Sequence, residues 1–363
     1  MTLVFLLFVP YGLYRVYHFL YLYFLLCRDR ELPVRRILIV KLSSLGDVIH
    51  NIPMAYDLNR LYPEAEIDWV VEEAYVDLIR PLAVRPIAIG LRRWLKGLKR
   101  GRFSFRELVH FYRCLREAQY DLIIDSQGLM KSALVAWLAK KPGGKIVGLA
   151  NRTIDSYYEF PVRFLYDECT PVTPKTHDVD RSRWLAIGEE PDDDTPQFYP
   201  PAYVQGLTGE PNPLNLTPGS YVLFFHATAD ARKAWPQAKW IDLGRYMNRA
   251  GYTVVLPWGS PAEQRASQTI AEGLGQALVP PPLGLPEFYR LIPQAALTVG
   301  VDTGLTHVAA AFNLPTVEIY VQTFKWKTCG YWGSNILNTG DKGAPPTVQD
   351  ILSDLNAAGF QLY

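Results

Sequence analysis

The sequence lacks the features that mark several common classes of protein. It has four cysteines in 363 residues, and none forms a Cys-x-x-Cys pair. We therefore expect reduced thiols rather than a disulfide framework or a structural zinc site. The six histidines include no His-Glu-x-x-His sequence or comparable cluster, so a protein-held catalytic metal is not expected. The formal net charge is only +1, and nothing in the overall composition indicates a nucleic-acid partner.

A glycine-rich dinucleotide fingerprint is also missing. The loop after the first predicted strand, residues 43–47, reads Ser-Ser-Leu-Gly-Asp rather than Gly-x-Gly-x-x-Gly. A dehydrogenase is therefore a poor fit, and we expect no cofactor. Apolar residues, in contrast, are plentiful at 49% of the chain. That content supports sizeable cores, and the length suits two domains of ordinary size.

Residues 1–27 form an apolar run that is long enough to span a bilayer, which requires about 20 apolar residues. Arg15 and His18 lie near its middle, where an arginine costs about 2.5–3.5 kcal/mol on insertion scales. Four arginines between residues 28 and 36 would keep the rest of the chain cytoplasmic if the run spans. Two interpretations of residues 1–33 stay open: a membrane-associated segment, or an extension created by a mis-assigned translation start.

From residue 34 onward, short apolar runs alternate with stretches of helical periodicity. In the first half we predict strands at 36–41, 67–71, 121–125 and 145–149, and helices at 46–61, 104–118 and 128–139. In the second half we predict strands at 221–225, 252–256, 296–301 and 316–320, and helices near 237–249, 261–274, 304–312 and 347–358. Such alternation indicates parallel sheets joined by right-handed crossovers.

A proline-rich stretch divides the chain. Seven prolines fall between residues 190 and 219, and we interpret residues 196–219 as a linker rather than a packed element. The predicted domains are therefore residues 34–195 and 220–345, followed by a terminal helix within 346–363. The fold class is α/β, with two Rossmann-like domains facing a cleft that is a favoured place for a ligand.

Two loops of the first half are candidate sites, because ligands of open α/β sheets bind at the carboxyl ends of strands. Asp47 follows the first strand and would act as a general base that takes a proton from an attacking hydroxyl. The alternative is a plain helix cap. Ser44 would shape this loop or bind a ligand. The loop at 125–132, which contains Gln127 and Lys131, should face the same cleft, although it too could simply begin a helix.

Three loops of the second half suit a phosphate-bearing ligand. Thr228 and Lys233 supply a hydroxyl and a compact cation that can neutralise a leaving diphosphate. Residues 302–307, Asp-Thr-Gly-Leu-Thr-His, open a helix whose N-terminus is suited to an anion, and glycine would let a phosphate approach the backbone. Glu263, after another strand, could accept hydrogen bonds from a ribose. Each of these residues also has an ordinary structural explanation. Lys233 could be a surface cation and Asp302 a helix cap. His307 could be a packed histidine and Glu263 a first-turn glutamate.

A basic run lies between the predicted strands of the first half, with Trp94 and Phe103 interleaved and no acidic residue before Glu107. Its members are Arg92, Arg93, Lys96, Lys99, Arg100, Arg102 and Arg106. A solvated helix face is the usual explanation for such a run. Its length without acidic partners favours an anionic partner or membrane headgroups.

Taken together and in order, these motifs resemble the lipopolysaccharide heptosyltransferases of glycosyltransferase family 9. The resemblance extends from about residue 36 to 320, and the second-half loops look more like the type I enzymes than type II. It rests on Lys41-Leu-Ser-Ser-Leu-Gly-Asp47, Asp125-Ser-Gln-Gly-Leu129, His226-Ala-Thr228 with Lys233-x-Trp-Pro236, Leu256-Pro-Trp-Gly259 and Val301-Asp-Thr-Gly-Leu-Thr-His307.

The resemblance implies a GT-B fold and inverting, metal-independent transfer of heptose from ADP-heptose to the inner Kdo of Kdo-lipid A. It places the protein peripherally at the cytoplasmic face of the bacterial inner membrane. The N-terminal domain would bind the acceptor and the C-terminal domain the sugar nucleotide. Asp47 would be the general base, with acceptor contacts from Ser44, Arg92, Arg93, Lys96, Gln127 and Lys131. Donor contacts would come from Thr228, Ala229, Lys233, Glu263, Leu283, Asp302, Thr303, Gly304 and His307.

Two segments depart from the family pattern. Ala229 stands where a second threonine is usual, which removes one hydroxyl from the phosphate loop, and Tyr320-Val-Gln-Thr323 replaces Tyr-Gly-Pro-Thr. Two other functions stay open: a related transferase with another nucleotide sugar or core acceptor, and an inert binding protein of the same fold. Retention of Asp47, Lys233 and Asp302 together argues against the inert protein.

Overall fold

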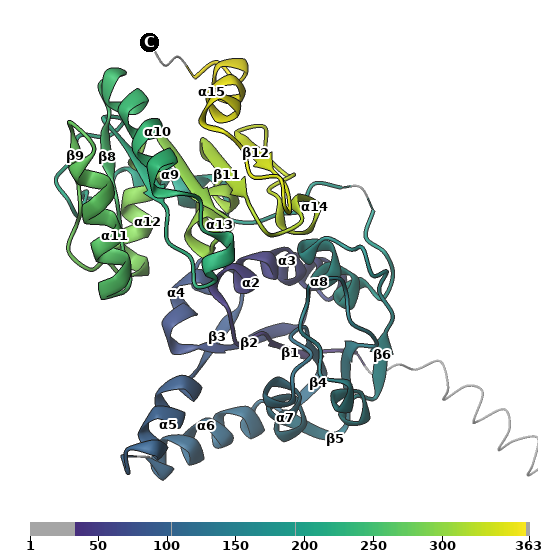
Figure 1. Ribbon diagram of the computed structural model, residues 1–363. Helices are drawn as coiled ribbons and strands as arrows, with labels where there is room; N and C mark the ends of the chain where they lie inside the picture. Colours follow the sequence, from purple (N-terminus) through teal and green to yellow (C-terminus); the bar gives the residue numbers. More distant parts are fainter. Residues whose placement is uncertain (1–32, 103, 193, 361–363) are drawn as a thin grey trace, which may run out of the picture.

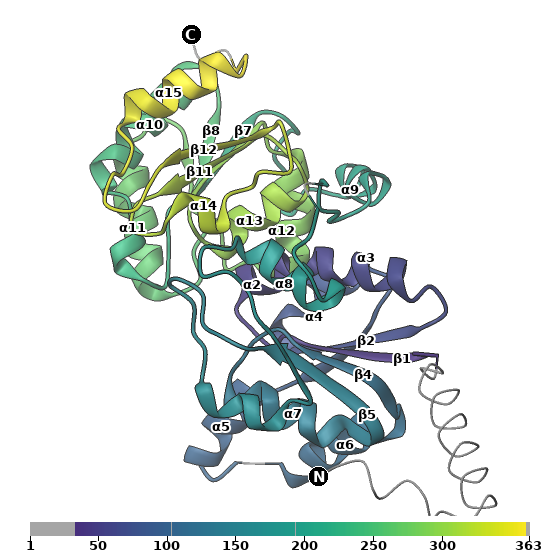
Figure 2. The same cartoon turned by 90° about the vertical axis from the view of Figure 1, so that its right-hand side faces the viewer.

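The computed structural model describes residues 33–102, 104–192 and 194–360. It contains two six-stranded sheets in which every paired strand is parallel. Figures 1 and 2 show the two sheets in separate halves of the molecule, each flanked by helices. The predicted fold class, α/β with two Rossmann-like domains, is confirmed. The apolar run at residues 1–27, with its two interpretations, lies outside the described residues.

The first sheet has the strand order β3-β2-β1-β4-β5-β6. Its strands are β1 (Arg36–Val40), β2 (Glu66–Glu72), β3 (Arg85–Ile89), β4 (Tyr120–Asp125), β5 (Lys140–Leu149) and β6 (Glu168–Thr170). Its helices are α2 (Leu45–His50), α3 (Ile52–Leu61), α4 (Val76–Ile79), α5 (Leu91–Lys99), α6 (Phe105–Glu117), α7 (Met130–Ala139) and α8 (Asp178–Ile187), with 3-10 turns η1 (Glu73–Tyr75) and η2 (Phe160–Leu165).

Helices cover both faces of this sheet, as the alternation of β1 requires. Ile37 and Ile39 point into the core beneath α2, α3 and α8, whereas Leu38 and Val40 belong to the core formed with α5, α6 and α7. The first set of helices lies between the sheet and the second domain, and the second set lies on the far side of the molecule (Figure 1).

The second sheet has the order β12-β11-β10-β7-β8-β9. Its strands are β7 (Tyr221–Phe225), β8 (Thr253–Val255), β9 (Ala277–Leu278), β10 (Leu297–Val301), β11 (Thr316–Tyr320) and β12 (Ile336–Gly340). The accompanying helices are α9 (Pro201–Thr208), α10 (Gln237–Arg249), α11 (Pro261–Glu272), α12 (Leu285–Leu291), α13 (Gly304–Ala311), α14 (Lys325–Thr328) and α15 (Val348–Ala357), with 3-10 turns η3 (Ala231–Lys233) and η4 (Ile292–Gln294).

Both sheets share one topology, and it determines where a ligand can bind. In each sheet the first and fourth strands in chain order are neighbours: β1 beside β4, and β7 beside β10. The strand order reverses at these pairs, and the crevice outside their carboxyl ends is the binding position of doubly wound folds. A ligand is therefore expected to bind among the four loops that follow β1, β4, β7 and β10.

Two predictions need correction. The helix expected at 46–61 is two helices, because Pro53 at the start of α3 cannot continue the backbone hydrogen-bond ladder of α2. The interpretation of 196–219 as an unpacked linker is wrong for residues 201–208, which form α9 and bury Val204. Proline is well suited to the first position of a helix, so Pro201 begins this element rather than preventing it. The domain boundaries themselves stay predictions.

No helix in the described part of the chain is both long and apolar enough to cross a bilayer.

Candidate active site

A cleft of about 470 Å³ lies between the two domains and is lined by all four of these loops. From the first domain come Lys41, Ser43, Ser44, Gly46 and Asp47 after β1, and Gln127, Leu129 and Lys131 after β4. From the second domain come Thr228, Ala229, Asp230 and Lys233 after β7, and Asp302, Thr303, Gly304 and His307 after β10. The structure thus brings together eleven of the sixteen site residues predicted from the sequence.

The two carboxylate oxygens of Asp47 have different surroundings. Oδ2 is held by its own loop, whereas Oδ1 is available to a ligand in the cleft. The backbone N–H and the hydroxyl of Ser44 donate to Oδ2 at 2.8 and 2.7 Å. Oδ1 lies 3.9 Å from Lys41 Nζ. Burial raises the pKa of Asp47, but the charge of Lys41 and the two Ser44 hydrogen bonds outweigh it and hold the pKa well below its usual range. Helix capping and an ionised, ligand-facing oxygen therefore coexist in this residue.

Lys41 is a buried cation at the base of the cleft. Its Nζ donates to the Ser126 carbonyl at 3.4 Å, and its side chain is 4% exposed. Burial lowers the pKa of Lys41, while the attraction of Asp47 acts in the opposite direction. Lys41 belongs to the motif at residues 41–47, but the sequence alone does not indicate a role for it. A lysine directly after the apolar run Ile37–Val40 was the available signal, since buried lysines are nearly always paired.

Asp302 is the centre of a hydrogen-bond network on the opposite side of the cleft. Its Oδ2 accepts from Lys233 Nζ at 2.6 Å and from the Thr323 hydroxyl at 2.6 Å. Its Oδ1 accepts from the Thr328 hydroxyl at 3.2 Å and lies 3.0 Å from His307 Nε2. Burial raises the pKa of Asp302, but His307 and Lys233 together keep it well below its usual range. Asp302 therefore remains charged and fixes the position of Lys233.

His307 lies between two carboxylates. Its Nδ1 is 2.9 Å from Oε1 of Glu318, a fully buried residue of β11 whose Oε2 accepts from the Tyr320 hydroxyl and the Gly330 N–H. Burial lowers the pKa of His307, but Glu318 and Asp302 outweigh it and raise the pKa to about 10. His307 is thus a cation at neutral pH, and both ring nitrogens donate.

Removal of the Glu318 charge should therefore destabilise the protein in a pH-dependent way. The pKa of His307 rises from an ordinary value of 6.5 to about 10 on folding, so the pairing stabilises the fold fully below pH 6.5 and loses its effect as the pH rises through 10. We expect Glu318→Gln to lower the free energy of unfolding by about 3–5 kcal/mol at pH 6, with a smaller deficit at pH 10. Urea unfolding of both proteins at several pH values measures this. A deficit that stays constant from pH 6 to 10 would contradict a cationic His307.

The helices that begin at the two switch points touch each other through glycines. A Cβ on Gly304 of α13 would lie 2.5 Å from Leu45 Cδ2, and a Cβ on Gly46 of α2 would lie 3.0 Å from His307 Cδ2. The sequence pattern predicts that Gly304 makes room for a phosphate. The space beside its Cα is instead occupied by Leu45 of the other domain, so this glycine permits close packing of α2 against α13.

Five predicted site residues do not line the cleft. Glu263 lies in the first turn of α11, where its Oε2 accepts from the Gly259 N–H at 2.7 Å, which is the local role named as its alternative. Leu283 packs against the hydrophobic core. The remaining three lie on α5, and they are Arg92, Arg93 and Lys96. Their assigned roles stay predictions.

Arg181 and Lys327 are cleft residues that the sequence reasoning missed. Arg181, on α8, donates to the Thr153 hydroxyl at 3.1 Å, and Lys327, on α14, donates to the Asp155 carbonyl at 2.8 Å. Neither helix was predicted from the sequence, and both side chains are nearly buried. In the part of the chain that the structure describes, no group of three or more His, Cys, Asp or Glu side chains is placed to hold a metal ion.

Comparison with known proteins gives consistent matches. Residues 108–351 match the profile of Glycosyltransferase family 9 (heptosyltransferase). The chain is 37% identical over 304 residues to Lipopolysaccharide heptosyltransferase 1 of Pseudomonas aeruginosa, covering 83% of this chain and 82% of that protein.

Two solved structures have nearly the same architecture. E. coli heptosyltransferase WaaC with ADP superposes with a TM-score of 0.74 at 31% identity, covering 89% of this chain and 99% of that one. The same enzyme with ADP-2-deoxy-2-fluoro heptose gives a TM-score of 0.70 at 30% identity, again covering 89% of this chain and 99% of that one.

Proposed function

The chain belongs to glycosyltransferase family 9, the heptosyltransferases, and on this basis we propose that it transfers heptose from ADP-heptose to the inner Kdo of Kdo-lipid A. The observation that carries the proposal is the arrangement of the cleft, where Asp47 of one domain faces the Lys233–Asp302 pair of the other. The similar E. coli enzyme is described with ADP and with an ADP-heptose analogue, which supports the choice of donor.

On the donor side, the diphosphate of ADP-heptose would bind between Lys233, Thr228 and the start of α13 at Thr303. Lys233 presents a compact charge already oriented by Asp302, and the N-terminus of a helix favours an anion. As the bond from the anomeric carbon to the diphosphate breaks, negative charge accumulates on the departing ADP. A cation held in place beforehand stabilises that charge without reorganisation.

On the acceptor side, a Kdo hydroxyl would lie beside Asp47 Oδ1. The hydroxyl oxygen attacks the anomeric carbon from the face opposite ADP, its proton passes to the carboxylate, and the configuration at that carbon inverts. Because the pKa of Asp47 is low, the proton transfers only once the new bond has begun to form and the hydroxyl has become acidic.

The anionic acceptor would be held by cations of both domains. Lys131 and Arg181 line the cleft on the first domain and Lys327 on the second. Arg181 and Lys327 share the carboxylate of Asp178, at 3.4 and 3.5 Å, so the three cations keep an excess of positive charge that suits the carboxylate of Kdo. Ser44 and Gln127 add hydrogen-bonding groups nearby. Arg92, Arg93 and Lys96 would meet the more distant phosphates of lipid A. Because that acceptor is membrane-anchored, we place the enzyme at the cytoplasmic face of the inner membrane, as a peripheral protein.

A transfer assay with purified protein tests the proposal. We expect ADP-heptose and Kdo-lipid A to give ADP and a product heavier by one heptosyl residue, measured by mass spectrometry. A panel of other nucleotide sugars addresses the replacement of threonine by Ala229. Transfer from another donor and none from ADP-heptose would overturn the donor assignment, and no transfer from any donor would favour an inert protein of the same fold.

A further inference from the structure

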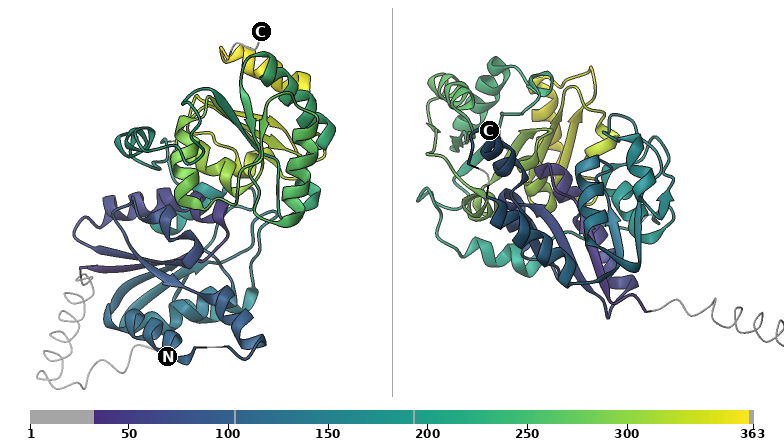
Figure 3. Two further views of the ribbon diagram at one scale, coloured as in Figure 1. Left: turned by 90° about the vertical axis from the view of Figure 1, so that its left-hand side faces the viewer. Right: turned by 90° about the horizontal axis from the view of Figure 1, so that it is seen from below.

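Helices α6 and α7, which pack against each other, carry rows of exposed apolar side chains. On α6 the row is Phe105, Val109 and Tyr112, and on α7 it is Met130, Leu134 and Trp137. Both rows repeat at i, i+4 and i+7, the spacing of one helical stripe. The helices lie in the layer farthest from the second domain, which Figure 3 shows from below.

These rows are additional to the hydrophobic core. The core-facing side of α6 is formed by Phe111 and Leu115, and that of α7 by Ala133 and Ala136. Trp137 is nevertheless 54% exposed, and on η2, which packs against α7, Phe164 is 76% exposed. Single exposed apolar residues are ordinary, but a large gathering of them in one layer marks an interaction surface.

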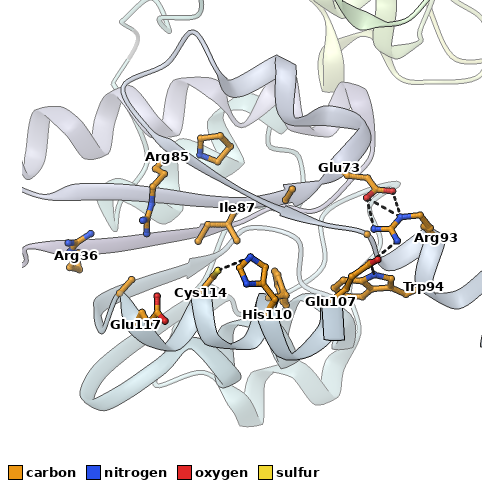
Figure 4. Close-up of a pocket in the computed structure, with 15 residues that line it drawn as sticks. Arg36, Glu73, Arg85, Ile87, Arg93, Trp94, Glu107, His110, Cys114 and Glu117 are labelled. Atoms are coloured by element: carbon orange, nitrogen blue, oxygen red, sulfur yellow. Dashed lines mark hydrogen bonds and ion pairs between the residues drawn. The ribbon is translucent and has the colours of Figure 1, made fainter. Parts of the chain in front are cut away.

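Helix α5 belongs to the same layer and is clamped by an ion-pair network (Figure 4). Arg93 binds Glu73 at 3.0 Å and Glu107 at 2.6 Å, and the Trp94 indole N–H donates to Glu107 at 2.8 Å. The basic run therefore does have acidic partners, one of them supplied by η1. With Trp94 turned inward, Leu95 and Leu98 of the same helix remain more than half exposed.

The charge of this layer is strongly positive. Residues 91–117 contain nine Lys and Arg residues and two Glu residues, a net charge of +7, in a chain whose formal net charge is +1. One of the two glutamates, Glu107, is already bound to Arg93. Lys99, Arg100 and Arg106, which lie where α5 ends and α6 begins, are exposed, and the Arg163 guanidinium lies 5.3 Å from the Phe160 ring centroid on η2.

We propose that this layer, the exposed face of α5, α6, α7 and η2, docks onto the surface of an anionic lipid bilayer. Exposed cations and exposed apolar side chains are interspersed on α5 and α6, and α7 adds the apolar side chains of Leu134 and Trp137. A bilayer interface suits both kinds of side chain, because headgroup phosphates attract the cations while the apolar side chains enter the boundary of the acyl chains.

The position of the cleft fits this orientation. Leu129 and Lys131, at the start of α7, line the cleft, whereas Leu134 and Trp137 of the same helix are exposed. One helix thus leads from the docking face to the cleft. This inference rests on the proposed function for its meaning, since a membrane-anchored acceptor would then present its sugar to Asp47 while its acyl chains stay in the bilayer.

Co-sedimentation of the full chain with vesicles tests the docking face, and it requires no catalysis. We expect binding to phosphatidylcholine vesicles that contain phosphatidylglycerol and much weaker binding to pure phosphatidylcholine. The charge variant Lys99→Glu/Arg100→Glu/Arg106→Glu should bind mixed vesicles about a hundredfold more weakly. The apolar variant Leu98→Ser/Val109→Ser/Trp137→Ser should also lose at least about tenfold.

Matched controls carry the same kinds of change on the second domain or elsewhere on the first. They are Arg245→Glu/Arg249→Glu/Arg265→Glu for charge and Leu61→Ser/Tyr246→Ser/Tyr331→Ser for exposed apolar residues. All variants keep residues 1–27, so any contribution from that segment is common to them. Circular dichroism and ADP binding report whether each variant is folded. Equal binding of folded face variants and controls to mixed vesicles would overturn the proposal, as would failure of the wild type to bind them.

A second readout separates docking from the proposed function. Face variants should transfer heptose normally to a deacylated, water-soluble Kdo acceptor but poorly to Kdo-lipid A in vesicles. If the wild type binds vesicles through this face yet transfers nothing, the docking face stands and the proposed function fails. If face variants lose transfer to both acceptors equally, the face does not act through the membrane.

Discussion

Replacement of Asp47 by asparagine is expected to lower turnover by about 10²–10⁴-fold, the usual contribution of a positioned general base, while ADP binding stays unchanged. Asparagine retains an oxygen that can accept the two hydrogen bonds of Ser44, so the loop and the start of α2 should keep their geometry. What it cannot do is receive the proton of the attacking hydroxyl. Turnover at saturating donor and acceptor, together with calorimetric titration of ADP, measures both parts of this expectation.

A suitable control is Asp77→Asn. Asp77 is also in the first turn of a short helix of the first domain, and its side chain is 37% exposed, as is that of Asp47. It pairs only with Arg80 among the described residues and does not line the cleft. The Asp77→Asn control should have the same turnover and the same ADP affinity as the wild type. Near-normal turnover by Asp47→Asn would remove the general-base role from this residue.

Replacement of Lys233 by glutamine should lower kcat/KM by about 10²–10³-fold, which is typical of removing one preorganised group that stabilises transition-state charge. Its Nζ lies 2.6 Å from Asp302 Oδ2, so the cation is already in place before the donor arrives. Loss of the charge should slow cleavage of the bond between the anomeric carbon and the diphosphate. It should also weaken ADP binding, because the negative charge of Asp302 would then repel the diphosphate without a neighbouring cation. Steady-state kinetics with ADP-heptose and inhibition by ADP provide the two measurements.

The neighbouring residue offers a matched control, since Arg232→Gln removes the same charge one position away. Arg232 points to Asp230 and its side chain is 76% exposed. We expect that change to alter kcat/KM by less than a few fold, in keeping with the small contribution of exposed ion pairs. If the two variants lost activity equally, a general electrostatic effect of the loop would replace the specific role of Lys233.

The sequence was most informative where local patterns decide the structure. Apolar runs at 37–40 and 221–225 identified β1 and β7 to within a residue, and polar residues that follow both strands line one cleft. Asp47 also has the helix-capping role that its position predicts. In doubly wound folds the loops at strand ends converge by topology, so recognising the alternation was sufficient to bring distant loops together.

Local patterns could not reveal features that depend on partners far away in the chain. Glu318 looks anomalous in an apolar strand, but only the fold shows that His307 neutralises it. The basic run showed no acidic neighbour in sequence, whereas Glu73 reaches Arg93 from an earlier turn. Gly304 fitted a phosphate-binding pattern, yet its missing side chain is explained by Leu45. In each case the deciding contact joins segments that no short window contains.

The contact between α2 and α13 has a consequence for the timing of the reaction. Asp47 and Asp302 are each no more than two residues away from the glycines at which these helices meet. Any separation of the two helices at this point would therefore also move Asp47 away from Asp302, and a displacement of about 1 Å between reacting groups is enough to cost a factor of about a hundred in rate. The side chains of Leu45 and His307 fill the space beside these two glycines, so a single methyl group added at either position would disturb the contact that holds the two halves of the cleft in register.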